Sequence, residues 1–187
     1  MSYHKQYLPK EFSMKWIVTV FAVICVVISA NTLADTSAML TLPSGVRVKI
    51  VESAFQKSLF NISGCVEAGK ICRINGHIPF GSGFSIPKTY VKSITVLYQG
   101  QSYSLDVSDM YDAWGARPLE VKGAVRYFGG KCFDTKNCQL RGLFSDAAGS
   151  FVAEWQIVGG LPFRTVLTSS NDVVHLFMKN IDPPEFE

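Results

Sequence analysis

The sequence predicts an all-β fold, either an antiparallel β-sandwich or a partly open barrel, held by two disulfides and exported from the cytosol. Three observations lead to this prediction. Between residues 35 and 187, short apolar–polar alternating runs are separated by turn residues roughly every eight to twelve positions. The same region holds four cysteines, which is an even number. An uncharged apolar run at residues 16–30 precedes it.

The apolar run at 16–30 predicts a signal for export. It is shorter than the roughly 18 to 20 apolar residues that a helix needs to cross a bilayer. Thr32 and Ala34 supply small residues where a signal peptidase reads, so we place a signal peptide at 1–34. The product would be periplasmic or secreted. The alternative is an uncleaved anchor, in which 16–30 holds the domain to a membrane outside the cytosol and is its only membrane contact.

The remaining residues 35–187 have the size of one ordinary domain, and we predict a single all-β domain there. They hold 15 Lys and Arg against 14 Asp and Glu, because most of the basic excess lies in the leader. A nearly neutral domain lacks the basic surface on which nucleic-acid binding depends. We therefore expect no nucleic-acid partner.

Four cysteines in an exported chain indicate disulfides. Three connectivities are open, and we favour Cys65 with Cys72 and Cys132 with Cys138, because each pair flanks a short polar connection. The alternative is a zinc site made of all four thiolates. Six residues lie between Cys65 and Cys72, and five between Cys132 and Cys138. Both spacings are wider than the two to four residues usual between zinc ligands. We expect no metal and no cofactor.

In the first half of the domain, residues 35–42 are predicted to form a weakly structured lead-in segment. A turn follows at 43–45. Strands are predicted at 46–50, 59–65 and 70–78, and one helical turn at 53–58. The clearest pattern is a hairpin at 94–107. With Gly100 and Gln101 as its two-residue turn, apolar residues fall on one face and serines on the other.

The second half predicts a further hairpin and a meander. Strands at 120–131 and 139–144 flank the loop between Cys132 and Cys138, so that a disulfide would close the base of this hairpin. Three strands then follow in close order, at 151–157, 163–168 and 173–178, joined by turns rich in Gly, Ser and Asn. The region shows no helical periodicity of useful length.

Candidate catalytic groups are few. His175 alternates with apolar neighbours and is assigned to a strand face, whereas His77 lies near Ser82 in a Gly-Ser-Gly segment without the strand-turn-helix context of a nucleophile elbow. Asp106, Asp109 and Asp112 are spaced by three, but the intervening residues do not fit a calcium loop, so helix caps and loop positions explain them better. No catalytic residue is assigned.

Three residues of the loop 109–118 are the binding candidates. Tyr111, Trp114 and Arg117 belong to the types enriched at interface hot spots, and loops on a rigid β scaffold commonly carry binding sites. The competing interpretation is that Tyr111 and Trp114 fold inward and close one end of the sandwich, with Arg117 paired to Asp112.

These features favour an exported, non-catalytic protein whose partner is another protein, such as a periplasmic inhibitor of the immunity type. The first alternative is a small periplasmic or secreted hydrolase that uses His77, Ser82 or the aspartates. The second is a structural or adhesive subunit of an envelope assembly, for which residues 35–42 are the candidate donated strand.

Overall fold

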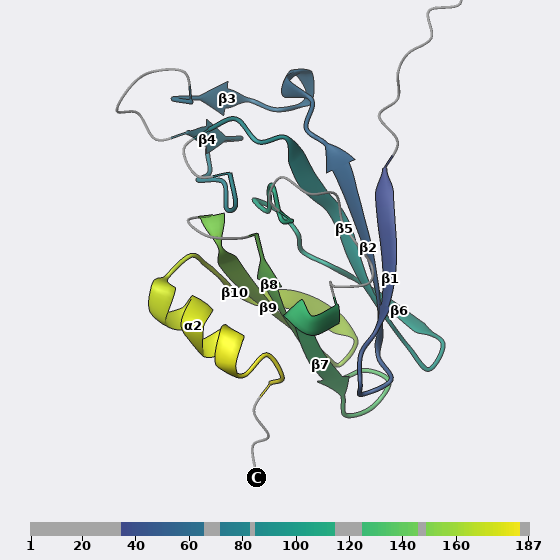
Figure 1. The fold of residues 1–187 in the computed structure, drawn as a ribbon. Helices are drawn as coiled ribbons and strands as arrows, with labels where there is room; N and C mark the ends of the chain where they lie inside the picture. The colour runs from purple at the N-terminus through teal and green to yellow at the C-terminus, as the bar shows by residue number, and fades with distance from the viewer. Residues whose placement is uncertain (1–34, 66–71, 83–84, 115–124, 146–148, 184–187) are drawn as a thin grey trace, which may run out of the picture. The chain divides into compact units, whose positions relative to one another are not determined.

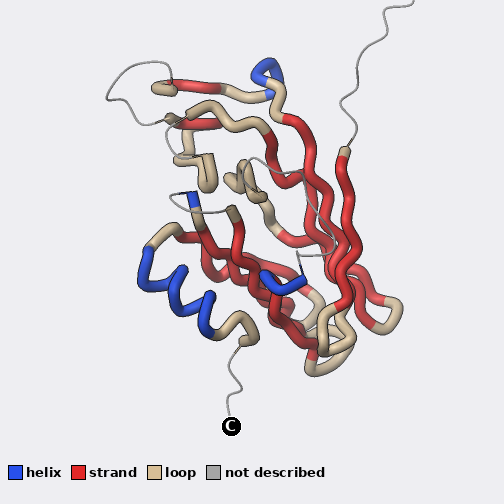
Figure 2. The backbone as a smooth tube through the Cα atoms, viewed as in Figure 1, coloured by secondary structure: helices blue, strands red, loops and turns tan. Residues whose placement is uncertain are grey.

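The computed structural model describes residues 35–65, 72–82, 85–114, 125–145 and 149–183. Chain contacts divide the protein into Met1–Asn31 and Thr32–Glu187, and every described residue belongs to the second unit. The chain forms two four-stranded antiparallel sheets and a two-stranded ribbon. Figure 1 shows how they are arranged, and Figure 2 shows that strands predominate over helices. The predicted all-β fold of antiparallel strands is confirmed, and of the sandwich and the partly open barrel that were both predicted as possible, the two separate sheets correspond to the sandwich. The predicted leader, 1–34, lies outside the described residues.

The first sheet has the order β1-β2-β5-β6, with β1 Thr36–Thr41, β2 Arg47–Ala54, β5 Thr89–Tyr98 and β6 Gln101–Leu105. The weakly structured lead-in predicted at 35–42 is wrong, because β1 pairs with β2 along its whole length. Ala38 and Leu40 alternate with exposed residues and are buried in the core, which stabilises the strand. The segment considered for strand donation is thus paired within its own sheet.

The hairpin β5–β6 forms where it was predicted, with a different turn. Gln99 and Gly100 occupy the turn, with φ of 45° and 81°, and Tyr98 faces Gln101. Two successive left-handed residues make the tight turn whose twist matches that of the strands. The pairing is therefore shifted by two residues from the one we predicted. Because side chains alternate with a period of two, this shift leaves the predicted buried face, including Val96 and Leu105, unchanged.

The second sheet has the order β10-β9-β8-β7, with β7 Phe128–Cys132, β8 Cys138–Phe144, β9 Phe151–Val158 and β10 Leu161–Thr168. The strand predicted at 120–131 is confirmed at 128–131, which belong to β7. Residues 125–127 instead form the short helix η2, Val125–Tyr127, and 120–124 lie outside the described residues. Cys132 and Cys138 pair directly across the base of the β7–β8 hairpin and form a disulfide, as predicted.

The strand predicted at 173–178 is wrong, since these residues belong to the helix α2, Asn171–Lys179. Its buried residues Val174 and Phe177 are three positions apart and pack on Val152 of β9. A short apolar run fits both the strand and the helix period, and packing against the sheet decides between them. Asp172 in the first turn favours the helix through its dipole. Among the described residues, no helix is of a length and apolarity to span a membrane.

The main core lies between the two sheets. It contains the aromatic rings of Phe144, Phe151 and Trp155, which are at most 1 % exposed. Phe144 stacks on Phe151 at 5.1 Å between ring centroids and meets Trp155 edge-on at 6.2 Å. Burial of these large rings supplies much of the hydrophobic stabilisation of the sandwich.

A second, smaller core lies beneath the ribbon of β3, Ile62–Ser63, and β4, Arg73–Ile74, which follows the short helix η1, Lys57–Leu59. Cys65 and Cys72 form the predicted disulfide there. With the pair at Cys132 and Cys138, this places all four cysteines in local bridges, and such bridges are typical of an oxidising, extracytoplasmic compartment.

Replacing Cys65 and Cys72 together by alanine is expected to lower the free energy of unfolding by about 2 to 3 kcal/mol, because the bridge closes a short loop in the unfolded chain. The two cysteines are seven positions apart. Urea denaturation measures the change. The matched control replaces Cys132 and Cys138, six positions apart, for which nearly the same loss is expected. An unchanged unfolding midpoint in the first variant would contradict the prediction.

Candidate functional site

The loop predicted to bind does not present its aromatic residues on one surface. Tyr111 is 4 % exposed and packs edge-on against Phe55 and Phe60 of the smaller core. Trp114 is half-buried and meets Phe144 of the main core edge-on at 6.0 Å. Arg117 lies outside the described residues. Tyr111 and Trp114 therefore belong to two different cores, and Tyr111 also lines a pocket.

That pocket is open to solvent, and its volume is about 260 Å³. It lies between the ribbon, the start of β5 and the loop at 107–111. The following residues line it: Phe60, Asn75, His77, Tyr90, Val91, Val107, Ser108, Asp109, Met110 and Tyr111. We refer to it as the ribbon pocket. Its lining combines three aromatic residues, Phe60, Tyr90 and Tyr111, with polar ones.

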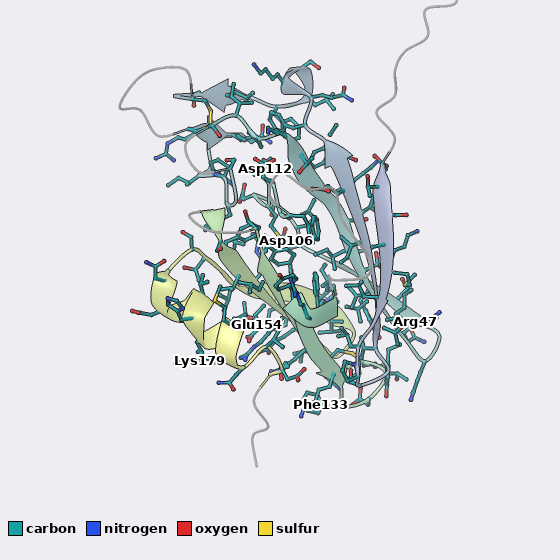
Figure 3. All side chains as sticks on the ribbon, in the orientation of Figure 1. Arg47, Asp106, Asp112, Phe133, Glu154 and Lys179 are labelled. Atoms are coloured by element: carbon teal, nitrogen blue, oxygen red, sulfur yellow. A yellow bond between two sulfur atoms is a disulfide. The ribbon has the colours of Figure 1, made fainter. Side chains whose placement is uncertain are left out.

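The loop that forms one wall of the ribbon pocket is fixed by the second sheet. Trp155 of β9 donates its indole N–H to the carbonyl of Asp106 at 2.7 Å. Arg164 of β10 donates to the carbonyl of Ser108 at 2.6 Å and pairs with the Asp106 carboxylate at 3.2 Å. Figure 3 labels Asp106 and Asp112 at the two ends of this loop. A partly buried hydrogen bond and a partly buried ion pair thus hold the wall in one conformation.

The same loop is held from the other side by backbone pairing. Met110 and Tyr111 form isolated bridges with Phe80 and Tyr90, and the amide of Tyr111 donates to the carbonyl of Phe80 at 2.9 Å. Gly81 permits this approach, because a Cβ atom built there would lie 1.8 Å from the carbonyl oxygen of Tyr111. Its φ of +97° also favours glycine.

Three residues around the ribbon pocket have left-handed backbone although they are not glycine: Asn75, Asp109 and Asp112, with φ of 53°, 65° and 40°. Asn and Asp tolerate this region best, because their short side chains bond to nearby backbone. Asp112 accepts from the amides of Lys88 and Thr89 at 2.8 and 2.9 Å, and Asn75 accepts from the amide of Asn61 at 3.0 Å. Such conformations are concentrated at functional sites.

His77 and Asp109 meet at the mouth of the ribbon pocket. Nδ1 of His77 lies 3.1 Å from both carboxylate oxygens of Asp109. The side chain of His77 is 66 % exposed, whereas that of Asp109 is 19 % exposed. The two residues are 32 positions apart. The hydrolase alternative names His77 together with the aspartates, but no spacing in the sequence indicates that Asp109 is the aspartate that His77 contacts. Only the antiparallel folding of the ribbon beside the loop brings them together.

Burial raises the pKa of the Tyr111 hydroxyl to about 12, and the negative charge of Asp109 adds to this rise. The phenol therefore keeps its proton at neutral pH. It presents a hydrogen-bond donor and an aromatic ring, without a negative charge of its own. The Asp109 carboxylate is consequently the acidic charge of the pocket.

Of the residues named for the hydrolase alternative, His77 and Asp109 meet at the ribbon pocket, whereas Ser82 does not join them. Ser82 is buried, its hydroxyl has no hydrogen-bond partner among the described residues, and it does not line the ribbon pocket. His175 is exposed on α2, which packs on the second sheet. Within the described part of the chain, no three His, Cys, Asp or Glu residues are grouped to hold a metal ion.

Asp106, Asp109 and Asp112, which are spaced by three in the sequence, have separate protein partners. Asp106 is paired with Arg164, Asp109 with His77, and Asp112 with the backbone that leads into β5. They act as loop-forming residues, and only Asp109 faces the ribbon pocket. Comparison with protein-family models, with curated proteins and with solved structures finds no match for this chain.

Proposed function

We propose that this protein is an exported, non-catalytic binding protein that holds another protein through the ribbon pocket. The observation that carries the proposal is the size and lining of the pocket. Small-molecule sites usually enclose about 300 to 1,000 Å³. A volume of about 260 Å³ lies below that range and suits a single anchor side chain inserted by a partner.

The rigidity of the site supports the proposal. The pocket walls are held by the Cys65–Cys72 disulfide, by the bond from Trp155 to the loop and by the bridges to Met110 and Tyr111. A preformed pocket loses little conformational entropy when a partner docks, which favours tight association. A periplasmic inhibitor of the immunity type is the form of this function that we favour, with secretion or retention at a membrane as the alternatives.

Replacing His77 by tryptophan is expected to abolish recovery of the partner, because the bulkier ring would fill the mouth of the ribbon pocket. The experiment purifies the tagged full-length protein from its own host and identifies co-purified proteins by mass spectrometry. The matched control is His175→Trp, which places the same ring at an exposed histidine of α2, away from the pocket.

The proposal is supported if a stoichiometric partner accompanies the wild type and the His175→Trp variant but is lost from His77→Trp. Equal recovery by both variants would show that the partner docks elsewhere. Repeated recovery of the wild-type chain alone would contradict the binding function itself.

One observation favours a hydrolase as the second candidate. The contact of His77 Nδ1 with Asp109 resembles the way a carboxylate orients a general-base histidine, which would leave Nε2 to act on a substrate. Among the described residues, no hydroxyl or thiol donates to that ring. The base would therefore have to activate water. Turnover of a chromogenic ester that is lost in His77→Trp and retained in His175→Trp would favour this candidate over the binding function.

A further inference from the structure

The charges and rings of the ribbon pocket indicate which side chain it accepts. Resting on the binding function proposed above, we infer that the anchor is a basic side chain, a lysine or an arginine, presented by the partner protein. Among the ten residues that line the pocket, all within the described part of the chain, Asp109 is the one carboxylate and none is lysine or arginine. The pocket is thus electrostatically complementary to a cation.

Asp109 is placed to receive a cation from the pocket side. Its side chain is mostly buried, so a charge pair there is screened less than one at the surface. His77 contacts both carboxylate oxygens through a single ring nitrogen. A carboxylate offers about four acceptor directions, so a guanidinium or ammonium group finds further acceptor positions on the same oxygens.

The aromatic wall favours the same occupant. The ring of Phe60 meets those of Tyr90 and Tyr111 edge-on, at 5.4 and 6.2 Å between centroids. The planes of these rings are therefore steeply inclined to one another. Cations bind to aromatic faces within about 6 Å of the ring centre. The long methylene stem of a lysine or arginine also packs well against such rings while its charged end reaches the carboxylate.

Other anchors fit this lining less well. An acidic side chain would be repelled by Asp109 at close range. An apolar anchor would displace water from the Asp109 carboxylate without offering a hydrogen bond or a charge in its place, which costs free energy. A basic side chain alone satisfies the carboxylate and the rings together.

The test titrates isotope-labelled full-length protein with N-acetyl-arginine amide and with N-acetyl-lysine amide, followed by NMR chemical shifts. N-acetyl-citrulline amide serves as the uncharged analogue of arginine. We expect the two cations to shift the signals of residues 75–77 and 107–111, and citrulline to bind roughly five- to tenfold more weakly. The cations should bind Asp109→Asn more weakly by a similar factor. Asparagine retains the shape of aspartate and tolerates the left-handed backbone there.

The matched control is Asp172→Asn, which changes the net charge equally but lies in the first turn of α2. It should bind the cations as the wild type does. Equal shifts with citrulline and arginine, equal binding by Asp109→Asn, or no shifts in these segments would each overturn the basic anchor. The binding function would still stand if the partner were lost from His77→Trp, so the two proposals fail separately.

Discussion

Replacing Trp155 by alanine is expected to lower the free energy of unfolding by about 4 kcal/mol, within the range seen when a large buried aromatic is truncated. Trp155 is fully buried and contacts Phe144 edge-on, so truncation leaves a cavity between the two sheets. The change also removes the donor to the carbonyl of Asp106, which anchors the wall of the ribbon pocket. Urea denaturation followed by circular dichroism measures the loss.

Trp155→Phe separates the two contributions. Phenylalanine keeps most of the buried ring but cannot donate, so the carbonyl of Asp106 loses its indole partner, at a cost of about 1 to 3 kcal/mol. We also expect the NMR signals of residues 106–111 to shift in this variant. If Trp155→Phe is as stable as the wild type and the loop signals stay unchanged, the indole bond does not fix the pocket wall.

Much of the sandwich could be predicted because strands with one buried face carry their period in the sequence. The alternation along β9, with Phe151, Trp155 and Ile157 on the core side, identified the strand and its buried face. We predicted the β5–β6 turn one residue too late. The prediction made Gly100 the first turn residue, whereas Gly100 is the second and follows Gln99. The predicted buried face is nevertheless correct, because the pairing of β5 with β6 shifts by two residues and side chains alternate with a period of two.

Two of the misassigned elements, β1 and α2, are short and depend on tertiary contacts. β1 is stabilised because Ala38 and Leu40 pack in one core with residues of later strands, and these contacts are distant in sequence. The helix α2 forms because Val174 and Phe177 cover one face of the second sheet. In six residues, helical and strand periods are too similar for sequence to separate them.

The candidate site was less predictable than the fold. Of the residues predicted to bind, Tyr111 lines the ribbon pocket, and its role in binding stays a prediction. The sequence did not indicate its neighbours from other segments. Phe60, His77 and Tyr90 reach the pocket from three separate parts of the chain. Asp109 was considered for metal binding, whereas its contact is with a histidine that is distant in sequence. A site assembled from non-local segments leaves no spacing that a single sequence reveals.

Replacing Arg141 by methionine is expected to lower the free energy of unfolding by about 3 to 5 kcal/mol, because it leaves the buried charge of Glu154 without its partner. Arg141 and Glu154 face each other on β8 and β9 at 2.5 Å, and both side chains are less than 15 % exposed. The Arg141 guanidinium also lies 4.8 Å from the ring of Phe177, so its loss removes support for α2. Figure 3 labels Glu154 beside this helix. Thermal and urea denaturation measure the change.

Adding Glu154→Met to Arg141→Met is expected to restore most of the stability lost in the single variant. The double variant buries no unpaired charge, and two methionines fill the space beneath α2 with flexible apolar side chains. Thr165, which donates to Glu154 at 2.9 Å, retains a second bond to the Glu154 backbone carbonyl. If the double variant is instead less stable than Arg141→Met, the ion pair contributes more than its desolvation costs. In that case the Arg141–Glu154 ion pair contributes more to the docking of α2 on the second sheet than the apolar contacts of Val174 and Phe177 do.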